Sequence, residues 1–125
     1  MFEVSVESSF AAGHALREDR CKCENPHGHN YKVRVTVLGD ALDNTGLLVD
    51  FKLLKLTMSQ VIDRLDHQYL NDIEPFRKVN PTAENIARYL YTCIKANLNL
   101  ETGGSGRLKM VRVWETDTCS ATYYE

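Results

Sequence analysis

The chain has 125 residues, of which 43% are hydrophobic and 26% are charged, and its formal net charge at pH 7 is -2. These values predict one folded domain spanning residues 1–125 and argue against a disordered or fibrous chain. No apolar run approaches the roughly 18–20 residues that cross a bilayer, and Met1-Phe2-Glu3-Val4 lacks the basic and hydrophobic regions typical of a signal peptide. No dense basic cluster indicates nucleic-acid binding, so we expect a cytoplasmic protein with small-molecule partners.

Alternating apolar and polar residues predict two strands in the first third of the chain. The first covers Phe2–Phe10, and the second covers Tyr31–Leu38. One face of the second strand is apolar, and its members are Tyr31, Val33, Val35 and Val37. The other face carries Lys32, Arg34 and Thr36, so we expect it to meet water or a polar interior, as in an antiparallel sheet.

Two amphipathic helices are predicted next. The first begins after Asp50, a residue type that caps helices, because apolar residues then recur with a 3.6-residue period. They are Phe51, Leu54, Met58, Val61, Ile62 and Leu65. The second helix is predicted from an N-cap at Thr82 to about Asn99. Its inward stripe is Ala83, Ile86, Leu90 and Ile94.

Two strands, Leu108–Glu115 and Ala121–Tyr124, complete the order ββααββ. The preceding Gly103-Gly104-Ser105-Gly106 leads into a strand, whereas a phosphate-binding loop opens a helix, so we expect a connector. This order predicts an α+β fold, with a four-stranded antiparallel sheet and two helices on one face. The uncovered face and exposed edges favour assembly with further copies.

Three of the four histidines lie close to the first two strands. His27 and His29 are two residues apart at a strand entrance, so their rings point to one face, and His14 follows the first strand. Three imidazoles with an open fourth position are typical of catalytic zinc. Spacing alone leaves two alternatives, polar surface histidines and a structural zinc site closed by Cys21 or Cys23.

Two further groups of residues indicate a function only in combination with the other motifs. Asp66-His67 offers a carboxylate beside an imidazole just past a helix, and Glu115 ends a strand. Alone, the first is typical of a helix end and the second of a solvated strand residue.

Taken together, these residues resemble the 6-pyruvoyl/6-carboxy-tetrahydropterin synthase family over almost the whole chain, and the 6-carboxy branch most. The matching motifs are Phe10-x-Ala12-x-His14, Cys23-x-x-x-His27-Gly28-His29-Asn30-Tyr31, Gly46-x-x-x-Asp50-Phe51, Leu65-Asp66-His67-x-x-Leu70-Asn71, Pro81-Thr82-x-Glu84-Asn85 and Trp114-Glu115-Thr116. Their order along the chain makes the resemblance specific.

The resemblance implies a tunnelling fold, in which three subunits join their sheets into a barrel and two trimers stack into a hexamer. It implies that Zn²⁺ is held by three residues, His14, His27 and His29. It also implies that Cys23 is the general base, that Asp66 and His67 relay protons, often from a neighbouring subunit, and that Glu115 anchors the pterin and can share in proton transfer.

Residues before His27 bear on the reaction. Cys23, which three residues separate from His27, is similar to the 6-carboxy branch, which converts 7,8-dihydroneopterin triphosphate to 6-carboxy-5,6,7,8-tetrahydropterin, acetaldehyde and triphosphate for queuosine biosynthesis. We favour that reaction. Cys21 has the spacing of the 6-pyruvoyl branch, and Glu24 resembles members that cleave the side chain for folate synthesis. A non-enzymatic zinc module is the remaining alternative. Candidates to hold the triphosphate are Arg17, Arg20 and Lys22, although a solvated charged loop explains them equally.

Overall fold

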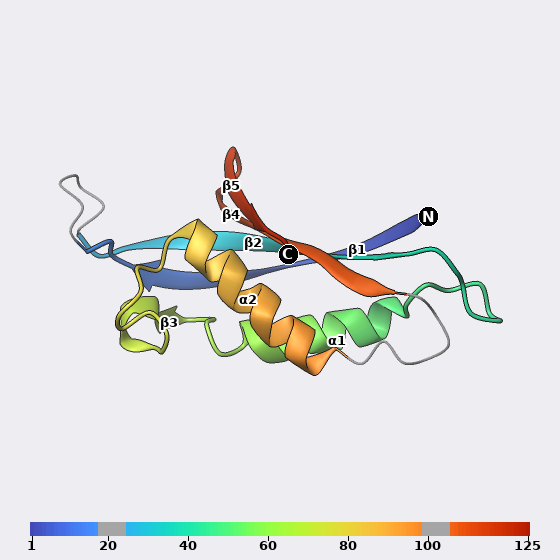
Figure 1. Ribbon diagram of the computed structural model, residues 1–125. Helices are drawn as coiled ribbons and strands as arrows, with labels where there is room; N and C mark the ends of the chain where they lie inside the picture. The colour runs from blue at the N-terminus through green and yellow to red at the C-terminus, as the bar shows by residue number, and fades with distance from the viewer. Residues whose placement is uncertain (18–24, 99–105) are drawn as a thin grey trace.

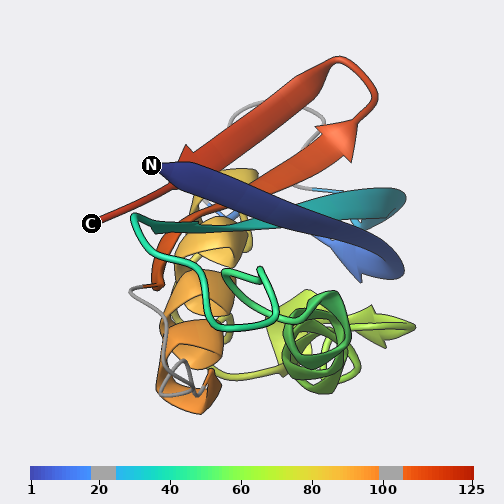
Figure 2. The same ribbon diagram turned by 90° about the vertical axis from the view of Figure 1, so that its right-hand side faces the viewer.

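The computed structural model describes residues 1–17, 25–98 and 106–125. The elements along the chain are β1 (Phe2–His14), β2 (His27–Gly39), α1 (Phe51–Ile62), β3 (Gln68–Tyr69), the short 3-10 helix η2 (Leu70–Asp72), α2 (Ala83–Asn97), β4 (Arg107–Thr116) and β5 (Cys119–Tyr123). The strands form one sheet in the order β3-β1-β2-β4-β5, and α1 and α2 cover the same face of it (Figures 1 and 2). The predicted α+β class, with both helices on one face, is confirmed.

The sheet differs from the prediction by one strand. Strands β1, β2, β4 and β5 pair antiparallel as expected, but β3 adds a parallel strand in which Gln68 and Tyr69 pair with Ala12 and Gly13. A strand of two residues has no alternation to detect, so sequence could not predict it. Strands β1 and β2 also extend beyond their predicted ends, because their pairing continues to His14 opposite His27.

The hydrophobic core lies between the sheet and the helices. The apolar face predicted for β2, from Tyr31 to Val37, is fully buried there, and it belongs to one cluster with the inward stripe of α2, namely Ile86, Leu90 and Ile94. Removing each such side chain from water contributes roughly 1.5–3 kcal/mol. Asp50 and Thr82 cap the two helices as predicted, by accepting hydrogen bonds from the backbone N–H groups of Lys52 and Asn85 respectively.

Two details of the predicted helices are wrong. Phe51 is among the periodic apolar residues predicted for the first helix, but it is 54% exposed. The buried residues of α1 begin only at Leu54. The second helix ends at Asn97, two residues before its predicted end. Among the described residues, no helix is long and apolar enough to span a bilayer.

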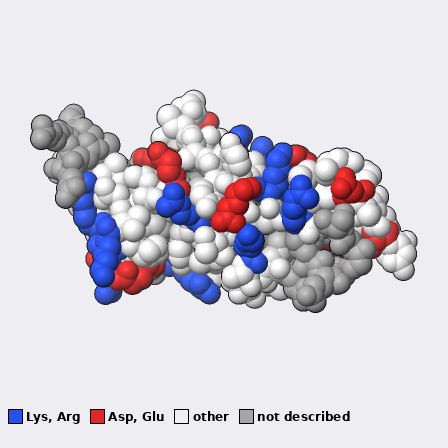
Figure 3. Space-filling view, in the orientation of Figure 1, with Lys and Arg blue, Asp and Glu red and all other residues white. Residues whose placement is uncertain are grey.

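The face of the sheet away from the helices is polar. Lys32 and Arg34 of β2 lie over the ring of Trp114 on β4, with the Lys32 Nζ 4.2 Å from the ring centroid. Arg34 also pairs with Glu7 of β1. Thr36 is buried, but its hydroxyl is hydrogen-bonded to that of Ser5 at 2.8 Å. The polar face predicted for the second strand is therefore present. On the surface in Figure 3, basic and acidic side chains are likewise interspersed.

Candidate metal centre

The pairing of β1 with β2 brings the three predicted histidine ligands together. His14 is the last residue of β1 and lies directly opposite His27, the first residue of β2, while Ala12 lies opposite His29. Directly opposed residues have neighbouring side chains, and residues two apart along a strand share a face. The three rings therefore form one cluster. The distance between ring centroids is 4.5 Å for His14 and His27 and 4.8 Å for His27 and His29.

Glu115 completes the cluster from β4. Its Oε1 lies 2.8 Å from Nε2 of His29 and 3.6 Å from Nε2 of His14. One potential ligand atom from each of these residues and from His27 lies within 4.8 Å of all the others. The register between β4 and β5 shifts between Trp114 and Thr116, around Glu115. Such irregularities redirect side chains. No local pattern in the sequence indicates that this carboxylate lies among the histidines.

Hydrogen bonds to the outer nitrogens determine what the inner nitrogens can bind. His14 Nδ1 lies 2.7 Å from the Pro81 carbonyl oxygen, and His27 Nδ1 lies 2.8 Å from that of Asn25. A carbonyl only accepts, so each Nδ1 donates a proton and each Nε2 of the neutral rings presents a lone pair. These two Nε2 atoms are only 3.0 Å apart. Two lone pairs at that distance repel unless a proton or a metal cation lies between them.

The remaining features also fit a metal cation. The buried Nε2 of His29 has no hydrogen bond of acceptable geometry among the described residues, despite its short distance to Glu115. Burial lowers the pKa of His14, which is 1% exposed, and thereby favours its neutral, ligating form. The Pro81 carbonyl and the Glu115 carboxylate oppose this shift without reversing it. Three imidazoles beside one carboxylate offer the nitrogen and oxygen ligands that zinc binds.

Tyr31 borders the cluster from inside the core. Its ring stacks on Phe10 at 4.9 Å and lies edge-on to His14 and His29 at 5.9 and 5.6 Å. The side chain is fully buried, and its hydroxyl has no partner among the described residues. Burial raises the pKa of Tyr31, with a further contribution from Glu115, so the phenol is neutral. The sequence indicated a core position for Tyr31 but not its contact with the histidines.

The Asp66-His67 pair forms a separate site at the edge of β1. Asp66 Oδ1 accepts a hydrogen bond from the Ala11 N–H at 3.0 Å and lies 3.0 Å from His67 Nδ1. The Ala11 N–H, and then His67, hold the pKa of Asp66 below its usual range. His67 has a φ of 59°, in the left-handed region, and its N–H donates to the Ala11 carbonyl. Such a conformation costs about 1–2 kcal/mol in a non-glycine residue.

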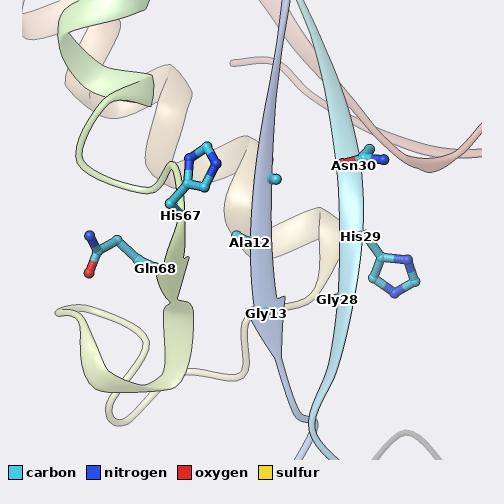
Figure 4. A pocket seen from close by; sticks show the side chains of 8 residues that line it. Ala12, Gly13, Gly28, His29, Asn30, His67 and Gln68 are labelled. Carbon is cyan, nitrogen blue, oxygen red and sulfur yellow. The ribbon is translucent and has the colours of Figure 1, made fainter.

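One subunit does not bring this pair to the histidine cluster. His67 and His29 both line a shallow hollow of about 390 Å³, together with Gly13, Gly28 and Asn30. In Figure 4, however, β1 and β2 run between the His67 ring and the His29 ring, which points away from β1. The ring of His67 is 80% exposed. It is thus free to meet groups from another molecule.

Several predicted residues lie outside the described part of the chain, namely Arg20, Cys21, Lys22, Cys23 and Glu24. Arg17 is described, and its Nη2 donates to the Phe76 carbonyl at 2.7 Å. The Nη2 atom of the guanidinium therefore holds neighbouring backbone, and binding of triphosphate by Arg17 stays a prediction. The described cysteines, Cys93 and Cys119, are free thiols.

Comparison with known proteins identifies relatives along the full chain. A family model described as 6-pyruvoyl tetrahydropterin synthase matches residues 3–125. The 6-carboxy-5,6,7,8-tetrahydropterin synthase of Synechocystis sp. is 36% identical, over 99% of this chain and 94% of the relative. The human 6-pyruvoyl tetrahydrobiopterin synthase is 37% identical, over 97% of this chain and 90% of the relative. The solved structure of Caenorhabditis elegans 6-pyruvoyl tetrahydropterin synthase matches with a TM-score of 0.84 and 32% identity, covering 100% of this chain and 97% of that one.

Proposed function

The chain belongs to the 6-pyruvoyl tetrahydropterin synthase family, and we propose that it is a zinc-dependent lyase acting on 7,8-dihydroneopterin triphosphate. The observation that carries this proposal is the cluster of His14, His27, His29 and Glu115, whose potential ligand atoms all lie within 4.8 Å of one another. A chain with the family's sequence over its full length thus holds a set of groups suited to a catalytic metal.

We assign the three histidines as the zinc ligands. When bound there, zinc supplies Lewis acidity that makes C–H protons beside the substrate hydroxyls easier to remove. The Pro81 and Asn25 carbonyls keep the Nε2 atoms of His14 and His27 available by accepting the Nδ1 protons. The fully buried Tyr31 ring and its stacked partner Phe10 exclude water from one side of the cluster.

We propose that Glu115 anchors the pterin and shares in proton transfer. A carboxylate can accept two parallel N–H hydrogen bonds, which matches the guanidine-like edge of a pterin. Its position beside the histidines supports a pterin held next to the metal.

We propose Cys23 as the base that removes a substrate proton, on the strength of its spacing from His27. A thiol acts as a base only when nearby positive charge lowers its pKa.

We further propose that the Asp66-His67 relay is contributed by a neighbouring subunit, in a hexamer of two trimers. The separation of this pair from the cluster by β1 and β2 supports a shared site. So does the free edge of β5, which ends the sheet and leaves backbone groups available for another copy. The polar outer face of the sheet does not require an apolar cover, so assembly is supported by this separation and by the sheet edge.

We favour the 6-carboxy product, and with it a role in queuosine biosynthesis. The spacing of Cys23 to His27 supports this choice, as does the Synechocystis relative named for that reaction. The decisive experiment is mass analysis of the products from 7,8-dihydroneopterin triphosphate. The proposal requires 6-carboxy-5,6,7,8-tetrahydropterin together with acetaldehyde and triphosphate, all dependent on zinc.

The 6-pyruvoyl reaction is the second candidate. It is favoured by Cys21, which has the spacing of that branch, and by the human relative, which is 37% identical. This reaction eliminates triphosphate and keeps all the side-chain carbons, so no acetaldehyde forms. Side-chain cleavage for folate synthesis, which Glu24 suggests, would instead yield a pterin with a shortened side chain. The same product analysis separates the three reactions.

A further inference from the structure

Two asparagine side chains hold the backbone that follows His14. Asn71 accepts from the N–H of Ala15 at 2.9 Å and donates to its carbonyl at 2.8 Å. Asn80 makes the same pair of bonds with Arg17, at 2.8 and 3.0 Å. Each amide therefore pairs with a residue of the first segment as a neighbouring strand would. Asn71 lies within η2 and Asn80 lies shortly before α2, and this part of the chain lies beside the end of β1 in Figure 1.

The Asn80 clamp connects directly to a proposed metal ligand. The next residue, Pro81, presents the carbonyl that accepts the proton of His14 Nδ1 at 2.7 Å. Hydrogen bonds therefore join the segment 14–17 to the dipeptide 80–81 at both ends, from His14 to Pro81 and from Arg17 to Asn80. The two backbone segments and these hydrogen bonds together form a closed ring. The Asn80 carbonyl is itself fixed by the Thr82 N–H and the Asn85 Nδ2, both at 2.9 Å. The position of the Pro81 carbonyl is thus determined on both sides.

We propose that Asn80 is a positioning residue for the metal centre, which acts by holding the Pro81 carbonyl against His14 Nδ1. This inference rests on the proposed function, because it assumes that the histidines bind zinc. A hydrogen bond to the outer nitrogen of a metal-binding histidine fixes its tautomer and its ring orientation. Pro81 is a particularly suitable acceptor here, because it is buried and so excludes water that would compete for the His14 proton.

Asn71 provides an internal comparison. It makes a clamp of the same geometry on Ala15, which also neighbours His14. The Asn71 carbonyl accepts only a long hydrogen bond of 3.4 Å, from Arg17 Nη2. Asn71 is also not adjacent in the chain to Pro81, whereas Asn80 is. If general anchoring of the backbone mattered most, replacing either asparagine would weaken zinc binding equally. If the Pro81 carbonyl matters most, Asn80 is the more important residue for metal binding.

The test measures zinc affinity of the purified, assembled protein by competition with a chromophoric chelator at constant pH. Loss of an outer-shell partner typically weakens metal binding by about 10–100-fold. We expect a loss in that range for Asn80→Ala, and a smaller loss for Asn80→Asp, which keeps the acceptor for the Arg17 N–H. Asn71→Ala should lose less than Asn80→Ala. Asn97→Ala is the control, because Asn97 Nδ2 also donates to a backbone carbonyl, that of Cys93, at the exposed end of α2.

A second readout does not need zinc. In the metal-free protein, ¹⁵N NMR of the imidazoles should show His14 as the Nδ1–H tautomer, and Asn80→Ala should introduce a second tautomer, whereas Asn97→Ala should not. Wild-type affinity in Asn80→Ala, or equal losses in Asn80→Ala and Asn71→Ala, would overturn the assignment. A wild-type protein that binds no zinc would instead refute the proposed function, and the tautomer measurement would still test the clamp.

Discussion

Zinc should stabilise the protein by a margin that depends on the histidine cluster. The two Nε2 atoms that face each other at 3.0 Å, on His14 and His27, gain a common partner when a cation binds. A ligand that binds only the folded state at 100 times its Kd adds about 2.7 kcal/mol. For a chain of this length, 1 kcal/mol corresponds to a Tm change of about 3–5 °C. The rise in Tm should therefore be about 8–14 °C.

His27→Ala separates this mechanism from general effects on folding. With zinc present, the variant should lose most of the rise. Without zinc, its Tm should lie within about 2 °C of the wild-type value, because the substitution removes a partly exposed ring and relieves the repulsion between the lone pairs. His67→Ala, at an imidazole that is 80% exposed, is the matched control and should keep the full rise. Scanning calorimetry with and without zinc measures both. An unchanged rise in His27→Ala would refute the reasoning.

Three further predictions concern the base, the acidic side chain and the assembly. Cys23→Ala should lower turnover by about 10²–10⁴-fold while zinc content stays unchanged, and Cys21→Ala should cost much less; the reverse order in steady-state assays would favour the 6-pyruvoyl reaction. The Ala11 N–H lowers the pKa of Asp66, so its stabilising contribution is complete above its ordinary pKa of about 3.9 and is lost as pH falls below it. Urea midpoints of wild type and Asp66→Asn should therefore converge as pH falls below about 4, and parallel curves would contradict this. Light scattering should give the mass of six chains, and a fully active monomer would exclude the shared site.

The sequence predicted those parts of the fold that repeat along a chain. The β2 alternation through Tyr31 and Val33, and the helical stripe of Ile86 and Leu90, depend only on which face is buried, and both predictions are correct. The predicted N-caps are also correct, because capping is a local interaction between Asp50 or Thr82 and the backbone two or three residues later. Strand ends were predicted less well, since His14 belongs to β1 only through its pairing with His27.

The features that sequence could not predict arise from contacts between distant segments. Strand β3 exists because Gln68 lies beside Ala12, and Glu115 joins the histidines at a register shift that no local pattern indicates. Asn80 belongs to none of the motifs found in the sequence. Its pairing with Arg17 spans 63 residues. The candidate catalytic and metal-binding residues were thus recognisable from their types and spacing, whereas the residues that contact them could be identified only from the fold.

The separation of the two groups of proposed catalytic residues gives a test of the shared site. Each subunit holds the histidine cluster on one side of β1 and β2 and exposes its own His67 on the other. If a site combines the cluster of one subunit with the relay of another, His27→Ala and His67→Ala subunits damage different parts of each site. Each variant alone should be inactive. After both are unfolded, mixed in equal amounts and reassembled, random pairing should combine an intact cluster with an intact relay in about one quarter of the sites. Activity should recover to about that fraction of wild type treated in the same way. A mixture that stays inactive, while mass spectrometry confirms mixed oligomers, would show that each subunit uses its own relay.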